Sequence, residues 1–158
     1  MYHIADVLAN VDQEATSPEE RRVLRLIALI HDTFKYKVDD ARPAKGANHH
    51  AAIARAFAEE YSDDPILLDL VERHDDAYNA WRKGAYGKKD WGKARECADD
   101  LIVHLGDALP LYVRFYRADN NTESKDQAPL AWFEGLVRDH GGGVEHGRGA
   151  TPAPDDDR

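Results

Sequence analysis

The sequence predicts an all-α fold, and three observations support this prediction. Apolar residues recur at helical spacing along most of the chain. Strong helix-start signals precede several of these stretches, for example Ser17-Pro18-Glu19-Glu20 and Asp64-Pro65. No segment has the convincing alternating pattern of a strand. We therefore expect one helical domain at residues 1–140. A tail rich in Gly, Pro and Asp at 141–158 is expected to be disordered.

The first two helices are predicted from their apolar stripes. A short stripe occupies residues 4–8. The serine cap and the proline that follows it open a second helix at residue 18. Its stripe continues to about residue 32 or 34. Residues 36–47 contain proline, glycine and mixed charges, and we expect them to form a loop.

The remaining helices follow at short intervals. Asn48 is expected to cap a helix that His49 and His50 open. The helix that starts at Asp64-Pro65 is expected to end near His74-Asp75, and the aromatic segment at 78–91 to form a short helix and a turn. The last three helices are expected at about 92–105, from Pro110 through Tyr116, and from Pro129 through Leu136.

Composition excludes several classes of protein. The net charge of −9 argues against general nucleic-acid binding, which needs a basic surface. No apolar segment approaches the ~20 residues that span a bilayer, and no signal peptide is visible. Cys97 is the only cysteine, so an internal disulfide cannot form. We expect a cytoplasmic protein.

Histidine and aspartate gather at the expected helix ends. His3 begins the first helix, His31-Asp32 ends the second, His49 and His50 open the third, and His74-Asp75 ends the fourth. Short connections between antiparallel helices bring such ends to one side of a bundle. Imidazole and carboxylate ligands there suit Mn²⁺, Fe²⁺, Co²⁺, Ni²⁺ or Zn²⁺. The alternative is that polar groups merely terminate these helices.

The segment LIALIHDTFK, from Leu26 to Lys35, is an apolar helix that ends in H-D-x-x-K. It resembles the motif of the HD superfamily of metal-dependent phosphohydrolases. That superfamily has an early His, then His-Asp, then a late Asp on an all-α bundle. His3 stands where the first ligand is expected. Asp119 follows an amphipathic helix and precedes a polar turn, so we assign it as the late aspartate. The resemblance covers roughly residues 1–137.

This resemblance implies a phosphohydrolase that uses metal-activated water on a nucleotide or another small phosphate ester. One or two divalent ions are expected. The implied ligands are His3, His31, Asp32 and Asp119 for the first ion, and Asp32, His50 and His74 for the second. His49 stays open as an alternative to His50 or as a substrate contact.

Further residues receive roles in catalysis or substrate binding. Lys35 would neutralise a substrate phosphate, and Asp75 would orient His74 or move a proton. The alternative is that both residues are ordinary charged groups at helix ends. The other candidates for phosphate binding are Arg114, Arg117, Thr122 and Lys125. The aromatic residues Tyr78, Trp81 and Tyr86 are expected to pack a short helix, and stacking on a base or another ring of the substrate is the alternative.

Two other functions fit the same sequence. Some HD proteins with six ligands hold two irons and oxidise a substrate with O₂. A non-catalytic helical module that binds a ligand or a protein is the second alternative. The expected partner is a small phosphorylated substrate. Binding to a membrane or to nucleic acid in general is not expected. The chain could also form a homo-oligomer. The sequence does not identify the substrate.

Overall fold

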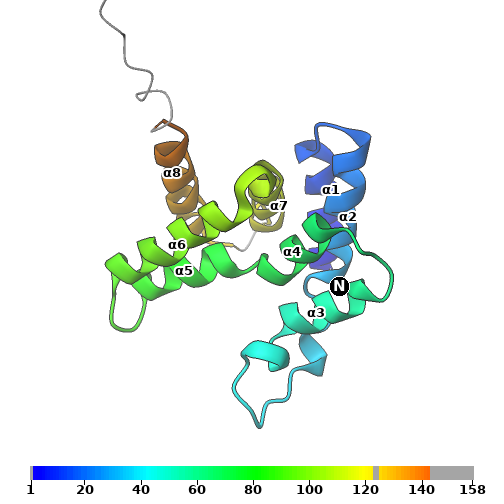
Figure 1. Ribbon diagram of the computed structural model, residues 1–158, viewed down its shortest axis with the longest axis horizontal. Helices are drawn as coiled ribbons and strands as arrows, with labels where there is room; N and C mark the ends of the chain where they lie inside the picture. Colours follow the sequence, from blue (N-terminus) through cyan, green and yellow to red (C-terminus); the bar gives the residue numbers. More distant parts are fainter. Residues whose placement is uncertain (1, 123–124, 143–158) are drawn as a thin grey trace, which may run out of the picture.

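The computed structural model of the protein describes residues 2–122 and 125–142. These residues form helices and no strand, which confirms the all-α prediction (Figure 1). The α-helices are α1 (Tyr2–Glu14), α2 (Pro18–Ile30), α3 (His50–Glu59), α4 (Pro65–Arg73), α5 (Asp76–Ala85), α6 (Trp91–Leu105), α7 (Leu109–Asn120) and α8 (Ala128–Gly142). Three short 3₁₀ helices lie at Lys35–Lys37, Gly46–Asn48 and Gly106–Ala108.

The C-terminal boundary of the domain differs slightly from the prediction. Helix α8 continues through Gly141 and Gly142, which were expected to belong to the tail. The rest of the predicted tail, residues 143–158, lies outside the described residues.

Two of the predicted helix starts are confirmed, and a third is wrong. Ser17 accepts a hydrogen bond from the backbone N–H of Glu20, and Asp64 accepts from two backbone N–H groups of α4. Asn48 was expected to cap α3. Its side chain instead bonds to the backbone of Asp39 and of the loop after it, and thereby closes the loop. His49 caps α3 through Nδ1, which accepts from the backbone N–H of Ala51.

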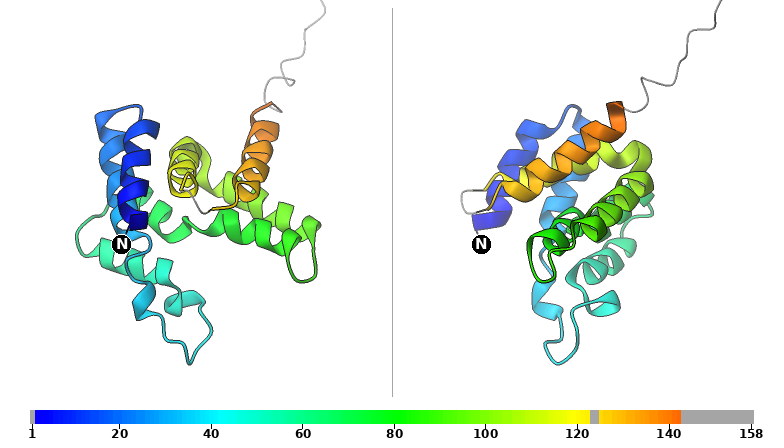
Figure 2. Two further views of the ribbon diagram at one scale, coloured as in Figure 1. Left: turned by 180° about the vertical axis from the view of Figure 1, so that it is seen from behind. Right: turned by 90° about the vertical axis from the view of Figure 1, so that its left-hand side faces the viewer.

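Helix α7 lies at the centre of the arrangement. Helices α1 and α2 lie side by side and pack against it, and α6 and α8 also contact it (Figures 1 and 2). Helix α4 contacts α2 and α3, and α5 packs along α6. The largest fully buried side chains include Tyr112 and Phe115 of α7, Phe133 of α8 and Ile27 of α2. No helix within the described residues is long and apolar enough to cross a membrane.

The pairing of α5 with α6 depends on a glycine. Gly84 of α5 faces the indole ring of Trp91, and a Cβ atom at this position would lie 2.2 Å from Cε3 of that ring. Gly135 in the interior of α8 has open space around it, since its nearest neighbour would be Nη2 of Arg138 at 3.9 Å.

We therefore expect opposite effects from the same substitution at two helix positions. Gly84→Ala should lower the free energy of unfolding by about 1–3 kcal/mol, because the methyl group overpacks the contact with Trp91. Gly135→Ala should raise it by up to about 1 kcal/mol, since alanine favours the helix. Urea denaturation of both variants measures the difference. Equal stabilisation by both would contradict the tight α5–α6 contact.

Candidate metal centre

Five helix ends bring histidine and aspartate side chains to one place. His3 lies in the first turn of α1, and His31-Asp32 directly follow α2. His50 is the first residue of α3, and His74-Asp75 join α4 to α5. Asp119 lies near the end of α7. The convergence expected from the sequence is therefore present.

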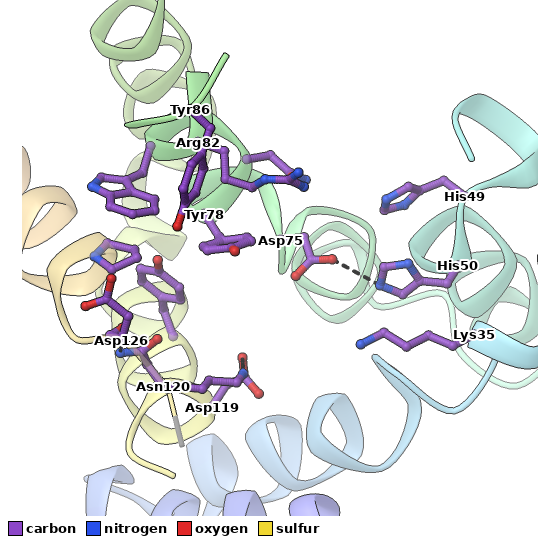
Figure 3. Close-up of a pocket in the computed structure, with 15 residues that line it drawn as sticks. Lys35, His49, His50, Asp75, Tyr78, Arg82, Tyr86, Asp119, Asn120 and Asp126 are labelled. Carbon is purple, nitrogen blue, oxygen red and sulfur yellow. Dashed lines mark hydrogen bonds and ion pairs between the residues drawn. The ribbon is translucent and has the colours of Figure 1, made fainter. Parts of the chain in front are cut away.

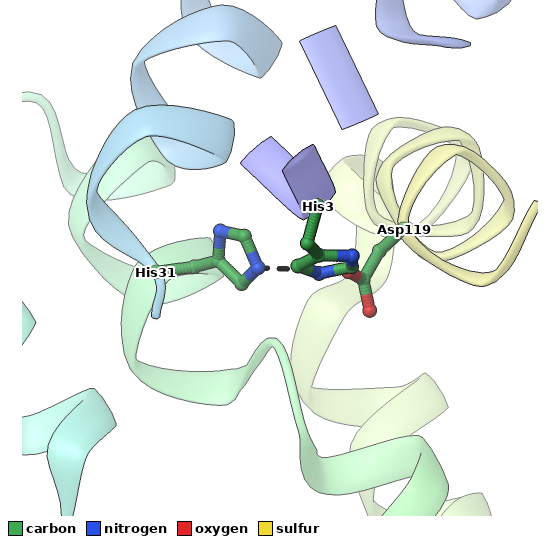
Figure 4. A group of neighbouring side chains, drawn as sticks. All are labelled: His3, His31 and Asp119. Carbon is green, nitrogen blue, oxygen red and sulfur yellow. Dashed lines mark ion pairs between the residues drawn. The ribbon is translucent and has the colours of Figure 1, made fainter. Parts of the chain in front are cut away.

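The first group of ligand atoms comes from α1, α2 and α7. Oδ1 of Asp119 lies 3.0 Å from Nε2 of His3 and 3.5 Å from Nε2 of His31 (Figure 4). Oδ2 of Asp32 lies 3.6 Å from Nε2 of His31 and 4.0 Å from Nε2 of His3. Two imidazoles and two carboxylates thus face a common point.

The second group contains Asp32, His50 and His74. Oδ1 of Asp32 lies 3.5 Å from Nε2 of His50 and 3.6 Å from Nε2 of His74. The two Nε2 atoms are 3.1 Å apart. Each oxygen of Asp32 therefore faces a different pair of imidazoles, so this carboxylate stands between the two groups.

Backbone carbonyl groups orient two of the imidazoles so that their Nε2 atoms can bind a cation. Nδ1 of His31 lies 3.0 Å from the carbonyl oxygen of Ala28, and Nδ1 of His74 lies 2.8 Å from that of Val71. When Nδ1 donates its proton to such a carbonyl, Nε2 presents a lone pair to the centre.

Two buried atoms of the first group lack hydrogen-bond partners. Nε2 of His31 and Oδ1 of Asp119 are both buried, and neither has a partner among the described residues. Unsatisfied buried acceptors are costly, and a cation between them would satisfy both. The residues therefore fit a divalent metal.

His50 and His49 differ in their surroundings. His50 is buried and belongs both to the group with Asp32 and His74 and to a further group with His49 and Asp75. Oδ2 of Asp75 lies 3.1 Å from Nε2 of His50. His49 belongs only to the group with Asp75, and its Nδ1 caps α3. The geometry favours His50 over His49 as a partner of Asp32.

The carboxylates of both groups are held in the ionised form. Burial alone would raise the pKa of Asp119, but the adjacent imidazoles of His3 and His31 and the charge of Lys125 hold it far below its usual range. Burial would likewise raise the pKa of Asp32, but its histidine neighbours and Lys35 keep it far below the ordinary value.

The pKa of His74 moves in the opposite direction. Burial would lower this pKa, but the hydrogen bond with Asp32 and the charge of Asp75 raise it above the ordinary value. The pKa of Asp75 is lowered, because hydrogen bonding and charge from His50 and the charge of His74 outweigh the effect of burial. Without a metal, a proton on His74 thus helps to balance the charge of Asp32 and Asp75.

A cavity of about 520 Å³ adjoins the second group and extends along α5 (Figure 3). Lys35 and Lys125 line it, and their Nζ atoms lie 2.6 Å from Oδ2 of Asp32 and of Asp119 respectively. His50 and Asp75 also line it and contact each other, with Nε2 and Oδ2 3.1 Å apart.

Three of the predicted phosphate-binding residues do not line this cavity. Arg114 forms an ion pair with Glu20 at 2.7 Å, and Arg117 pairs with Glu134 on α8. Both guanidinium groups therefore tie helices together. The hydroxyl of Thr122 is buried without a partner among the described residues, away from the cavity lining.

Two residues that support the site had no recognisable signal in the sequence. The buried hydroxyl of Tyr112 donates to the carbonyl of Arg73 and accepts from the N–H of Ala77, so it holds the junction that carries His74 and Asp75. The amide of Asn10 donates to the carbonyls of Ala118 and Asn121 at 2.9 and 2.7 Å. It thereby fixes the end of α7 beside Asp119.

The comparison with protein families agrees with this geometry. The family described as "HD domain" matches residues 1–110. The chain belongs to the HD domain family. This family is part of a superfamily of metal-dependent phosphohydrolases. Neither the curated proteins nor the solved structures include a significant match. The family match ends before Asp119, so the place of this aspartate beside His3 and His31 comes from the fold.

The raised pKa of His74 predicts how metal stabilisation depends on pH. The proton on His74 stabilises the folded, metal-free protein, because the pKa of His74 is higher in the folded state than in the unfolded state. This stabilisation is complete at pH values below the unfolded-state pKa of about 6.5. It is lost as the pH rises through the folded-state pKa. A metal replaces that proton. Mn²⁺ should therefore raise Tm more at about pH 8 than at about pH 6. Differential scanning fluorimetry with His104→Ala as a control measures this, because His104 pairs with Asp69 at the surface. The same Tm gain at both pH values would contradict the expectation.

Proposed function

We propose that the protein is a divalent-metal phosphohydrolase that holds two ions on either side of Asp32 and acts on a nucleotide or another small phosphate ester. One observation carries this proposal. The two oxygens of Asp32 face separate pairs of histidines, as a carboxylate shared by two cations requires. The HD family match supports the metal-dependent class of chemistry.

The ligand assignment follows the two groups. The proposed ligands are His3, His31, Asp32 and Asp119 for one ion, and Asp32, His50 and His74 for the other. Imidazole and carboxylate together suit Mn, Fe, Co, Ni or Zn ions. When bound, such ions lower the pKa of a water molecule and polarise a phosphoryl oxygen.

The remaining polar residues of the cavity suit a phosphate ester. Lys35 and Lys125 place two ammonium groups beside the carboxylates of the metal groups, where they would bind the phosphoryl oxygens of the substrate. Asp75 lines the cavity, and its lowered pKa keeps it ionised. Its position makes Oδ2 the proposed acceptor of a proton during hydrolysis. Asp75 also orients His50 through the same oxygen.

The lysine side chains of the cavity favour the phosphohydrolase over the oxygenase alternative. Both functions would use the same histidines and aspartates. Lys35 and Lys125 lie beside the two metal groups, where their ammonium groups would bind the anionic phosphoryl oxygens of a phosphate ester. Metal identity and O₂ uptake test this preference directly.

Metal content tests the bridging role of Asp32. Wild-type protein purified without a histidine tag should contain about two transition-metal ions per chain. Asp32→Ala should lose both ions, since the shared ligand is removed, whereas Asp119→Ala should retain the ion held by His50 and His74. His104→Ala should match the wild type. Inductively coupled plasma mass spectrometry measures these contents. An Asp32→Ala variant with full metal content would exclude the proposed bridge, and two irons with O₂ uptake would establish the oxygenase.

Phosphate release tests the reaction and the role of Asp75. The metal-loaded wild type should release inorganic phosphate from members of a panel of phosphate esters. Asp75→Asn should lower kcat by about 10²-fold or more, because the isosteric amide cannot accept the proton. Asp99→Asn is the matched control on α6 and should leave kcat unchanged. An Asp75→Asn variant with wild-type kcat at full metal content would remove Asp75 from the proposed mechanism.

A further inference from the structure

The cavity beside the metal groups has a second end that the proposed chemistry does not use. One face of α5 and the residue before it carry Asp75, Tyr78, Asn79 and Arg82 at the spacing i, i+3, i+4, i+7, and all four line the cavity. Figure 3 shows Asp75 directed toward His50, with Tyr78 and Arg82 farther along α5 and Tyr86 just beyond its end. The same helix therefore lines both ends of the cavity.

Aromatic rings form the wall of this second end. The rings of Tyr78 and Trp81 are nearly parallel, with an interplanar angle of 23° and centroids 6.2 Å apart. The ring of Tyr86 stands at 87° to Trp81, with centroids 5.6 Å apart. The guanidinium of Arg82 lies over Tyr78, 5.8 Å from its centroid. Flat apolar surface thus lies beside a cation.

These aromatic residues are only partly explained by packing. Trp81 is 9% exposed and meets the expectation that it packs the short helix. Tyr78 and Tyr86 are 39% and 57% exposed, so much of each ring remains accessible. Accessible rings grouped in a cavity are available to stack on a ligand.

A buried hydroxyl without a partner adds a second observation. Tyr116 lines the cavity and is 4% exposed, and its hydroxyl has no hydrogen-bond partner among the described residues. Its ring packs against Phe133 and Tyr112 of the core. A buried tyrosine hydroxyl ordinarily finds a partner, and leaving it unpaired is unfavourable. A polar atom of a ligand in the cavity would satisfy it.

The helix sets the separation between the two ends. At 1.5 Å per residue, Tyr78 lies ~4.5 Å and Arg82 ~10 Å beyond Asp75 along the axis of α5. A molecule with phosphate at the metal groups would therefore place a group attached through a short spacer against the rings.

We propose that the wall formed by Tyr78, Trp81 and Tyr86 binds a planar ring of the substrate, and that the Tyr116 hydroxyl bonds to a polar atom of the same molecule. This inference rests on the proposed phosphohydrolase function and narrows it to phosphate esters that carry a nucleobase or a similar flat ring. Tyr78 is then the residue that selects such substrates.

A matched pair of probes tests the ring site. Adenosine 5′-monophosphate and ribose 5-phosphate share the sugar and the phosphate, and only the first has a planar ring. The wild-type ratio of kcat/KM for the nucleotide to kcat/KM for ribose 5-phosphate should be about tenfold or more. Tyr78→Ala should reduce this ratio about tenfold, and Tyr78→Phe should retain it, because the ring remains. Tyr61→Ala, at an exposed tyrosine outside the cavity, should also retain it. A wild-type ratio near one would overturn the ring site while leaving the phosphohydrolase in place.

Tyr116→Phe separates ligand binding from a structural role. Removal of an unpaired hydroxyl should leave Tm unchanged or raise it, yet the KM for adenosine 5′-monophosphate should rise several-fold. A fall in Tm with unchanged KM would overturn the assigned hydrogen bond.

Direct binding keeps this test independent of turnover. If neither probe releases phosphate, isothermal titration of the metal-loaded protein with both probes still tests the ring site. Tighter binding of the nucleotide, weakened by Tyr78→Ala, would support the ring site although the phosphohydrolase function had failed. Equal binding of both probes would overturn the ring site.

Discussion

The carboxylate of Asp32 is the constraint on which the rest of the site depends. It is mostly removed from solvent, and a buried charge must be compensated. Lys35 and His74 compensate it in the metal-free protein. Its two oxygens point to different histidine pairs, so α1, α2, α3, α4 and α7 must all end or pass close to this one residue.

The site is held by contacts that lie outside the metal groups. Tyr112 ties α7 to the α4–α5 junction, and Asn10 ties α1 to the end of α7. These bonds hold the segments that carry His74, Asp75 and Asp119. Nε2 of His31 and Oδ1 of Asp119 have no hydrogen-bond partner among the described residues. A cation bound to such a cluster would also stabilise the fold, because it would replace a proton and satisfy unpaired acceptors.

The two ends of the cavity differ in chemistry, and this difference narrows the proposed function. Lysines and carboxylates surround the metal groups, whereas parallel and perpendicular aromatic rings line the far end. A substrate with a charged phosphate and a flat ring matches both ends. Helix α5 carries residues of each kind on one face, since Asp75 precedes its first turn and Arg82 lies two turns beyond.

The sequence alone determined the all-α class, the caps at Ser17 and Asp64, and the metal-ligand candidates at helix ends, because these depend on local spacing and residue type. Only the tertiary structure decided contacts between distant segments. It showed that Asp119 faces His3, that His50 rather than His49 joins His74, and that Arg114 and Arg117 tie helices together. It also revealed the supporting roles of Tyr112 and Asn10. Periodicity predicts which face of a helix is buried, but the partner of a side chain depends on how helices far apart in the chain pack together.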